Sequence, residues 1–234
     1  MLVFLDSETT GLEQADRMCS IACLYDNAYI YELINEGKKI CSEASSLHHI
    51  TNEMIEGKND FKASKAFSFL NEHNNEENIL IAHNVNFDLE KLAAAGLMWK
   101  GGIVDTLRVS KHMMPECDAF SLQFLRYELK LYREEEKLKQ GYGIKDALLA
   151  HNALGDAVVT QLLFNYLHEM MNVEEMKELS FKAVLLEKLS FGKHKGKYIE
   201  DVCMNDISYA RWLLSNDADE DVKYSINYYL EGNL

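Results

Sequence analysis

The carboxylates that could do chemistry in this sequence begin with a pair directly behind its first apolar run. Residues 1–5 have the composition of a buried strand, and Asp6 and Glu8 follow at once. Side chains two residues apart on a strand point to the same face, so these two carboxylates lie side by side. Neighbouring like charges destabilise a sheet, and burial makes the cost higher. The pair therefore indicates a site for a cation at the end of this strand.

Two aspartates and a histidine further along the chain complete the candidate set. Asp88 follows a second apolar run in IAHNVNFD, and Asp156 follows His151 by five residues in HNALGDA. Each of the three also has a structural explanation. An aspartate can cap a helix or interact favourably with the helix dipole at the N-terminus, and a histidine can serve as a hydrogen-bonded structural residue. As a set with Asp6 and Glu8, the carboxylates favour a hard cation, Mg²⁺ or Mn²⁺.

Such a donor set suits the hydrolysis of phosphodiesters. Several carboxylates that converge at strand ends can hold two divalent ions roughly 3.5–4 Å apart, which serve the attacking and the leaving oxygen. Histidine has an ordinary pKa of about 6.5 and can take the proton from the attacking water. The residue types therefore predict a site of metal-assisted hydrolysis, with His151 as the candidate base.

The elements that must position these residues alternate between strand and helix, which is typical of an α/β fold. Beyond the first strand, strands are predicted at residues 17–26, 27–35, 78–84 and the start of 101–114. Helices are predicted at residues 51–57, 62–73, 87–96, the end of 101–114, 121–131 and 154–171. The candidate carboxylates all lie where one of these elements begins or ends.

Two segments depart from this pattern. Residues 132–143 are rich in charge, and we interpret them as a solvated helical excursion because charge runs mark exposed faces. From about residue 176 the composition shifts, with FGKHKGK predicting a short strand or hairpin and ISYARWLL a helix. We therefore predict two domains, residues 1–175 and a small α+β module at residues 176–234.

Composition bounds the class of protein. Taken alone, the net charge of −14 argues against nucleic-acid binding, although metal ions and local basic patches can offset it. The five cysteines form no CxxC pair and are odd in number, so we expect reduced thiols and no zinc site. The sequence has no signal peptide pattern and no apolar run of about 18 residues. We expect a soluble cytoplasmic protein without a membrane partner.

Three segments, FLDSETTGL, IAHNVNFD and HNALGDA, resemble in order and spacing the motifs of the DEDD superfamily of 3′→5′ exonucleases. The resemblance is to the histidine subtype, the DnaQ-like and ribonuclease T group, and covers about residues 2–170. It implies a ribonuclease H-like mixed sheet with helices on both faces. It also implies that Asp6, Glu8 and Asp156 hold one metal ion and that Asp6, helped by Asp88, holds a second. His151 would be the general base.

The same resemblance implies contacts with the substrate. Residues that match the grip on the terminal nucleotide are Thr9, Thr10, Gly11, Leu12, Asn84 and Phe87. Backbone amides and Thr10 would reach the 3′-hydroxyl, and Leu12 would wedge against the base. The tail resembles a module that follows the nuclease domain in exodeoxyribonuclease X-like proteins. It is either an auxiliary nucleic-acid contact through Lys193, Lys195 and Lys197, or a structural cap whose aromatic residues form a core.

We predict a metal-dependent 3′→5′ exonuclease that releases nucleoside 5′-monophosphates from single-stranded or frayed DNA 3′ ends. An exoribonuclease of the same subtype stays open, because the motifs do not read the 2′-hydroxyl. A proofreading subunit and a catalytically silent nucleic-acid-binding protein are further alternatives, and retention of all four carboxylates argues against the last. The sequence identifies no polymerase or repair partner and no oligomeric state.

Overall fold

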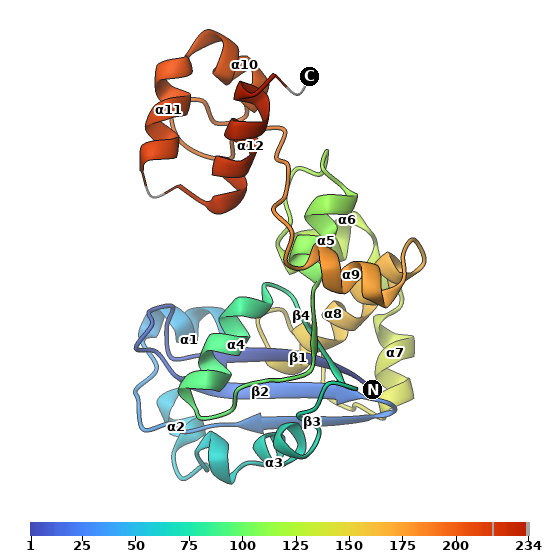
Figure 1. Ribbon diagram of the computed structural model, residues 1–234. Coiled ribbons are helices and arrows are strands. Elements are labelled where there is room, and N and C mark those ends of the chain that lie inside the picture. The colour runs from blue at the N-terminus through green and yellow to red at the C-terminus, as the bar shows by residue number, and fades with distance from the viewer. Residues whose placement is uncertain (217, 233–234) are drawn as a thin grey trace.

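The computed structural model describes residues 1–216 and 218–232, and its centre is one mixed sheet in the order β3-β2-β1-β4-β5 (Figure 1). The strands are β1 (Leu2–Thr9), β2 (Met18–Tyr25), β3 (Ala28–Leu33), β4 (Ile79–Ala82) and β5 (Gly102–Asp105). β2 runs antiparallel to β1 and β3, whereas β4 runs parallel to β1 and β5. The carboxyl ends of β1, β4 and β5 therefore meet at one edge, where α/β sheets place their ligands.

Helices cover both faces of the sheet. They are α1 (Ser42–His48), α2 (Asn52–Ile55), α3 (Lys65–Glu72), α4 (Val85–Ala94), α5 (Thr106–Met113), α6 (Leu122–Glu128), α7 (Glu135–Tyr142), α8 (Ala153–His168) and α9 (Val173–Leu179), with 3-10 turns η1 (Phe61–Ala63) and η2 (Leu131–Arg133). The predicted mixed sheet flanked by helices is confirmed. Sequence periodicity did not predict α1. Within the described residues, no helix is both long and apolar enough to cross a membrane.

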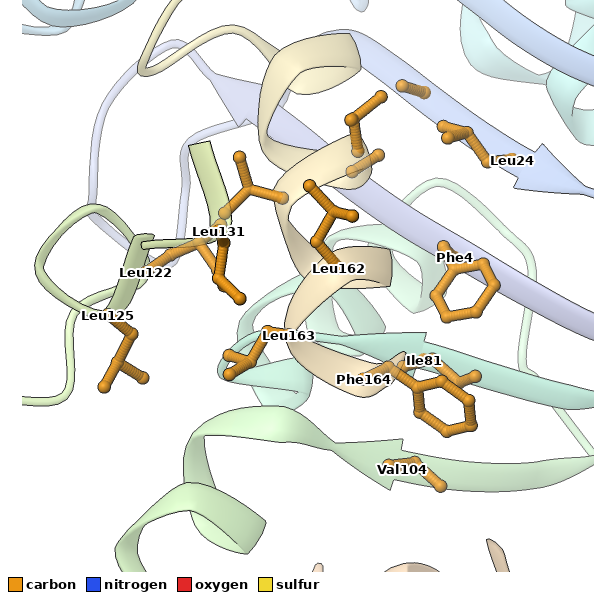
Figure 2. Close-up of a cluster of buried hydrophobic side chains, with 14 of the residues drawn as sticks. Phe4, Leu24, Ile81, Val104, Leu122, Leu125, Leu131, Leu162, Leu163 and Phe164 are labelled. Atoms are coloured by element: carbon orange, nitrogen blue, oxygen red, sulfur yellow. The ribbon is translucent and has the colours of Figure 1, made fainter. Parts of the chain in front are cut away.

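Strand alternation divides β1 between two apolar cores. Val3 and Leu5 pack on the face covered by α3 and α4. Phe4 points to the other face, where Figure 2 shows it near Phe164 of α8, and the two rings meet edge-on at a centroid distance of 5.3 Å. Edge-to-face pairs of buried rings add to the free energy of burial. The α8 core therefore fixes the helix that carries one of the predicted metal ligands against the strand that carries two others.

The C-terminal part is a small helical unit with its own core. It contains α10 (Ile199–Asn205), α11 (Ile207–Ser215) and α12 (Glu220–Leu230), which Figure 1 shows apart from the sheet. The predicted hairpin reduces to a single antiparallel bridge between Lys188 and Tyr198. The boundary at residue 176 stays a prediction, and Met176 of α9 packs in the α8 core whereas the separate cluster starts at Leu186. This packing favours a boundary about ten residues later.

The charged segment at residues 132–143 is helical over α7, as predicted, but one side of it is tied to the body of the protein. Tyr142 is buried, and Glu135 forms a two-bonded ion pair with Arg126 of α6. Lys137 and Glu134 are largely exposed, in agreement with a solvated outer face. One glutamate of this charged segment, Glu135, thus forms an ion pair that belongs to the interior of the protein.

Candidate active site

Three of the predicted carboxylates converge at the end of β1. Asp6, Glu8 and Asp156 each offer an oxygen, and the three oxygens lie within 4.8 Å of one another. Asp6 and Glu8 share the strand face of Phe4, which α8 covers, and Asp156 lies in the first turn of α8. The pairing of β1 with β2 shifts register between Glu8 and Thr9, an irregularity of the kind that re-aims side chains.

Burial and mutual repulsion make this cluster unfavourable without a cation. Burial raises the pKa of Glu8 to about 8, and repulsion from Asp156 and Asp88 adds to the effect. Burial likewise raises the pKa of Asp156 to about 7 and that of Asp6 well above its usual range. Within the part of the chain that the structure describes, none of the three forms an ion pair. Oxygen donors this close to one another, with no ion pair among the described residues, fit a divalent cation.

This arrangement predicts an unusual dependence of stability on pH. Because the folded pKa of Glu8 is about 8 and its ordinary value is 4.5, the folded state binds more protons than the unfolded state between these values. Stability of the metal-free protein should therefore fall as pH rises through that window. A divalent cation at about 100 times its Kd should restore about 2.7 kcal/mol, or roughly 5–10 °C in Tm.

Thermal unfolding followed by circular dichroism, with chelator or with Mg²⁺ or Mn²⁺, measures both effects. Potassium chloride at matched ionic strength is the control, because it screens charges without occupying a carboxylate site. A Tm that rises with pH in chelator, or a divalent effect no larger than that of potassium, would contradict the prediction.

Asp88 reaches the same place from the opposite face of β1. It lies in the first turn of α4, is 4% exposed, and accepts a 2.6 Å hydrogen bond from the hydroxyl of Ser7. Burial raises its pKa to about 7, although the bond from Ser7 opposes that rise. Asp88 stands outside the three-carboxylate group, and its role as a metal ligand stays a prediction.

Helix capping does not explain Asp88 or Asp156. The N-cap of α4 is Asn84, and the N-cap of α8 is Asn152, whose side chain accepts a bond from the Gly155 N–H. Both aspartates nevertheless lie in the first turn, where the helix dipole favours negative charge. The dipole contributes to holding these carboxylates but supplies no full positive charge, so it does not remove the need for a cation.

His151 lies at the mouth of the carboxylate cluster. Its backbone adopts a left-handed conformation with φ of 55°, and its N–H donates to Asp156 Oδ2 at 3.2 Å. The side chain is exposed and has no hydrogen-bond partner within the described residues. By contrast, His48 is buried, with Nε2 3.2 Å from the Thr9 carbonyl oxygen. His151 therefore lacks the bonds of a structural histidine, and its role as general base stays a prediction.

The loop after β1 is held rigidly by internal hydrogen bonds. The Thr9 hydroxyl donates to the Gly11 carbonyl at 2.7 Å, and the Thr10 hydroxyl donates to Asp16 Oδ1 at 2.8 Å. A Cβ on Gly11 would lie 2.5 Å from Asp16 Oδ2, so only glycine fits there. Leu12 is 81% exposed at the tip. The loop thus presents Leu12, while the predicted contact of the engaged Thr10 hydroxyl with substrate stays a prediction.

Two lysines secure that loop. Lys38 forms a 2.7 Å ion pair with Asp16, and a hydrogen bond from Lys38 lowers the pKa of Asp16 to about 2. Lys91 of α4 is buried and donates to the carbonyl oxygens of Glu13 at 2.9 Å and of Asp16 at 3.2 Å. Sequence reasoning missed Asp16 and Lys91, which lack any motif spacing that would have identified them.

The segment after β4 carries the other predicted substrate residues. Asn84 is exposed in a left-handed conformation with φ of 68°, and its N–H donates to Asp105 Oδ1 at 2.9 Å. Phe87 is half-buried, with the Lys91 ammonium 5.2 Å from its ring centroid. Asp105 ends β5, so it fixes the Asn84 turn at the same sheet edge as the carboxylates. Contacts of Asn84 and Phe87 with a nucleotide stay predictions.

A chain of hydrogen bonds links Asp156 to the charged helix α7. Gln123 Nε2 donates to Asp156 Oδ1 at 2.6 Å, and Arg126 Nη1 donates to Gln123 Oε1 at 3.1 Å. Arg126, 9% exposed, is held in turn by the carboxylate of Glu135. The side chain of Gln123 is thereby oriented so that its amide donates to the carboxylate.

We expect Gln123→Met to raise the divalent-ion concentration needed for half-maximal activity by about 10–100-fold, the usual effect of losing a group that orients a metal ligand. Methionine keeps the length and removes the donor. Gln140→Met is the matched control, because Gln140 bonds only to the exposed Glu136 side chain. The test is to measure the rate as a function of divalent-ion concentration for each variant. An unchanged concentration for half-maximal rate in Gln123→Met would contradict the role of Gln123 in orienting Asp156.

The three lysines predicted to contact nucleic acid lie far from the carboxylates along the chain, on the loop before α10. Lys193, Lys195 and Lys197 are all exposed. Lys193 forms a 2.8 Å ion pair with Asp206, which leaves Lys195 and Lys197 without an ion pair in the described part of the chain. Whether these lysines touch nucleic acid stays a prediction.

Comparison with known proteins supplies the family. Residues 3–164 match the sequence profile of a family described as "Exonuclease" and named for ribonuclease T. The chain belongs to this exonuclease family. Residues 189–218 match a second profile, described as "Exodeoxyribonuclease X-like C-terminal". The predicted family and exonuclease activity are confirmed, and the second profile falls on the helical module and its basic loop.

Relatives of this exonuclease include complete proteins and parts of larger ones. Exodeoxyribonuclease 10 of Escherichia coli K12 is 24% identical over 242 residues, which cover 99% of both chains. A DNA polymerase III PolC-type protein of Thermotoga petrophila is 32% identical over 191 residues, which cover 76% of this chain and 12% of that protein. The similarity to the polymerase is thus confined to a small part of it.

A solved structure supports the fold of this exonuclease. The structure titled "Exonuclease X in complex with 5′ overhanging duplex DNA" superposes with a TM-score of 0.59 at 22% identity, covering 77% of this chain and 99% of that one. At this identity the likeness concerns the fold, and it confirms the predicted ribonuclease H-like architecture.

Proposed function

We propose that this exonuclease removes nucleoside 5′-monophosphates from 3′ ends of DNA with the help of two divalent ions, Mg²⁺ or Mn²⁺. The observation that carries the chemistry is the cluster of Asp6, Glu8 and Asp156, whose oxygens lie within 4.8 Å of one another and form no ion pair among the described residues. The names of its relatives, exodeoxyribonuclease and DNA polymerase, support DNA as the substrate.

Each side chain has a defined task in this proposal. Asp6, Glu8 and Asp156 hold the first ion, and Asp6 with Asp88 holds the second. When bound, the ions would orient the attacking water and stabilise the charge on the leaving oxygen. His151 takes the proton from the attacking water, since its imidazole has no hydrogen bond to any residue that the structure describes. Asp156 accepts a hydrogen bond from the His151 backbone N–H, and this bond holds the base close to the carboxylate.

The terminal nucleotide is gripped by the loop after β1 and by the start of α4. Leu12 is exposed at the tip of a loop braced by Asp16, so its side chain packs against the terminal base. The backbone N–H groups of Gly11 and Leu12 reach the 3′-hydroxyl, because the Thr10 N–H is donated to the Arg17 carbonyl at 2.8 Å. Asn84 and Phe87 line the other side. Release of one nucleotide at a time follows, because these contacts hold the terminal nucleotide at the carboxylates.

Matched oligonucleotides test this function. Purified full-length protein with Mg²⁺ or Mn²⁺ should release nucleoside 5′-monophosphates from the 3′ end of single-stranded DNA, and chelator should abolish release. Duplex DNA and RNA of the same sequence belong in the same assay, with products identified by mass spectrometry. Faster release from RNA than from DNA would overturn the substrate, and products longer than mononucleotides would overturn the mode of cleavage.

A further inference from the structure

A cleft of about 1140 Å³ lies between the nuclease part and the helical module. Roughly 300–1,000 Å³ suffices for most small-molecule ligands, so this cleft has room for a longer one. Its nuclease wall includes His83, Asn84 and the segment from Pro115 to Leu122. The other wall consists of the segment from Val184 to Phe191 with Lys195. Figure 1 shows the chain between α9 and α10 passing beside α5 and α6 on its way to the module.

Two lining segments of the cleft adjoin, along the chain, residues of the carboxylate site. Asn84 begins the helix that carries Asp88, and Leu122 directly precedes Gln123, which bonds to Asp156. His83 braces this wall, with Nδ1 3.0 Å from Thr106 Oγ1 and Nε2 2.8 Å from the Phe120 carbonyl oxygen. Both edges of the nuclease wall therefore continue into helices that carry or contact a candidate carboxylate, α4 with Asp88 and α6 with Gln123.

A buried ion pair fixes the module that forms the opposite wall. Asp221 of α12 is 2% exposed and accepts bonds from Arg108 Nη1 at 3.1 Å and Nη2 at 2.9 Å. It also accepts the Val184 N–H at 2.9 Å, and Ser225 accepts the Leu186 N–H at 2.7 Å. Arg108 lies on α5, directly after β5. The ion pair between Arg108 and the buried carboxylate of Asp221 thus attaches the module to the nuclease part.

The basic loop of the module is shaped toward this cleft. Gly192 and Gly196 have φ of 71° and 82°, and His194 is buried with Nε2 2.9 Å from Asp206 Oδ2. Phe191, 39% exposed and directly before Gly192, and Lys195, between His194 and Gly196, line the cleft. Lys193 and Lys197 do not line it. An exposed ring with a neighbouring cation is the combination that binds unpaired bases and the phosphates between them.

The charges of the cleft favour a single strand over a duplex. Besides Lys111, Lys188 and Lys195, the lining contains four carboxylates, those of Glu116, Asp118, Glu187 and Asp219. A duplex presents its phosphates and hides its bases, so it requires a surface of positive charge. Unpaired bases offer aromatic faces that need no such surface. A cleft of mixed charge with one exposed aromatic ring, that of Phe191, therefore suits unpaired nucleotides.

We propose that this cleft binds the single-stranded DNA on the 5′ side of the terminal nucleotide, with bases against Phe191 and phosphates near Lys195. The proposal rests on the proposed function and extends it. It assigns the module to holding the strand while successive 3′ nucleotides enter the carboxylate site. The module thereby acts on the apparent affinity for long substrates and leaves the chemical step unchanged.

Phe191→Ala and Lys195→Glu test the proposal in the full-length protein. Kd is measured by fluorescence anisotropy in chelator, with an oligonucleotide of about 20 nucleotides, longer than the roughly 4–16 that one single-strand-binding module covers. KM and kcat are measured with the same oligonucleotide, with a trinucleotide and with the p-nitrophenyl ester of thymidine 5′-monophosphate. Lys100→Glu is the matched control, because Lys100 is exposed before β5, at the opposite end of the parallel strands.

We expect each cleft variant to raise Kd and KM for the long oligonucleotide about tenfold, within the range found for loss of one stacking ring. The kcat values, the trinucleotide, the ester and Lys100→Glu should stay at wild-type values. Equal effects on the trinucleotide and the long strand, or none on either, would overturn the cleft. Equal weakening of a blunt duplex would overturn the single-strand assignment.

The two proposals fail separately. Failure of the wild-type protein to hydrolyse the ester with either cation would count against the proposed function, whereas the Kd values in chelator do not depend on catalysis. Circular dichroism and Tm of each variant establish that the module is folded, so that a change in Kd reports on the cleft.

Discussion

Asp6→Asn should abolish nuclease activity and at the same time make the metal-free protein more stable. Asparagine keeps the shape of the side chain but removes a charge from a cluster whose oxygens lie within 4.8 Å of one another. Burial and repulsion from Asp156 raise the pKa of Asp6, which means that its charged form is costly in the folded state. Removal of that charge relieves the repulsion on Glu8 as well.

The loss of rate should reach at least about 10³-fold, because a bound cation supplies several kcal/mol of charge stabilisation and each 1.36 kcal/mol is tenfold. Single-turnover rates with saturating cation measure this loss, and thermal unfolding in chelator measures the gain in stability. Asp26→Asn is the matched control: Asp26 lies in the β2–β3 turn with φ of 47°, a conformation that asparagine tolerates. A variant of Asp6 that is both inactive and less stable would indicate a structural carboxylate.

The carboxylate pair could be predicted from the sequence because strand alternation is a local rule. Side chains two residues apart on a strand point to the same face, and this holds for any fold of the rest of the chain. The same rule explains why Ser7, which lies between them, faces Asp88 on the other side. Asp156 required more, since its position depends on how α8 crosses β1; the residue types made it a candidate, and the resemblance to a family assigned it to the same metal ion as Asp6 and Glu8.

Hydrogen-bond partners across elements could not be predicted. Gln123 meets Asp156 because α6 and α8 pack together, and a helical pattern gives no sign of which polar residue at their contact faces the site. Glu135 looked like one of three equivalent glutamates in a charged run, yet it alone pairs with the buried Arg126. Which glutamate of the charged segment points to the interior depends on how α6 and α7 pack in the fold.

The resemblance of the motifs predicted which residues lie at the site, but it did not predict the hydrogen bonds that these residues form in the structure. Thr10 matched a substrate-gripping position, but its hydroxyl is engaged with Asp16, so the loop's rigidity is what the structure adds. The module shows the opposite case. FGKHKGK predicts a short strand or hairpin, whereas the bond between His194 and Asp206 holds it as a loop, from which Phe191 and Lys195 line the cleft.

His151→Gly should lower kcat by about 10²–10⁴-fold, the usual contribution of a positioned proton acceptor, while cation binding stays unchanged. Glycine suits this position because the backbone has φ of 55°, a conformation that glycine adopts without strain. Every residue except proline keeps the backbone N–H that donates to Asp156 Oδ2. The variant therefore removes the imidazole and leaves the known bond to the carboxylate in place.

Added imidazole separates the role of base from a role in shaping the site. If the side chain only accepts a proton from the attacking water, free imidazole can enter the space left by His151→Gly and restore part of kcat at saturating cation. His49→Gly is the matched control, since His49 has the same left-handed backbone, with φ of 61° at the end of α1, and is not expected to need rescue. If instead the cation concentration for half-maximal rate rose in step with the loss of kcat, and imidazole had no effect, His151 would act by organising Asp156. The general base would then have to be sought elsewhere around the cluster.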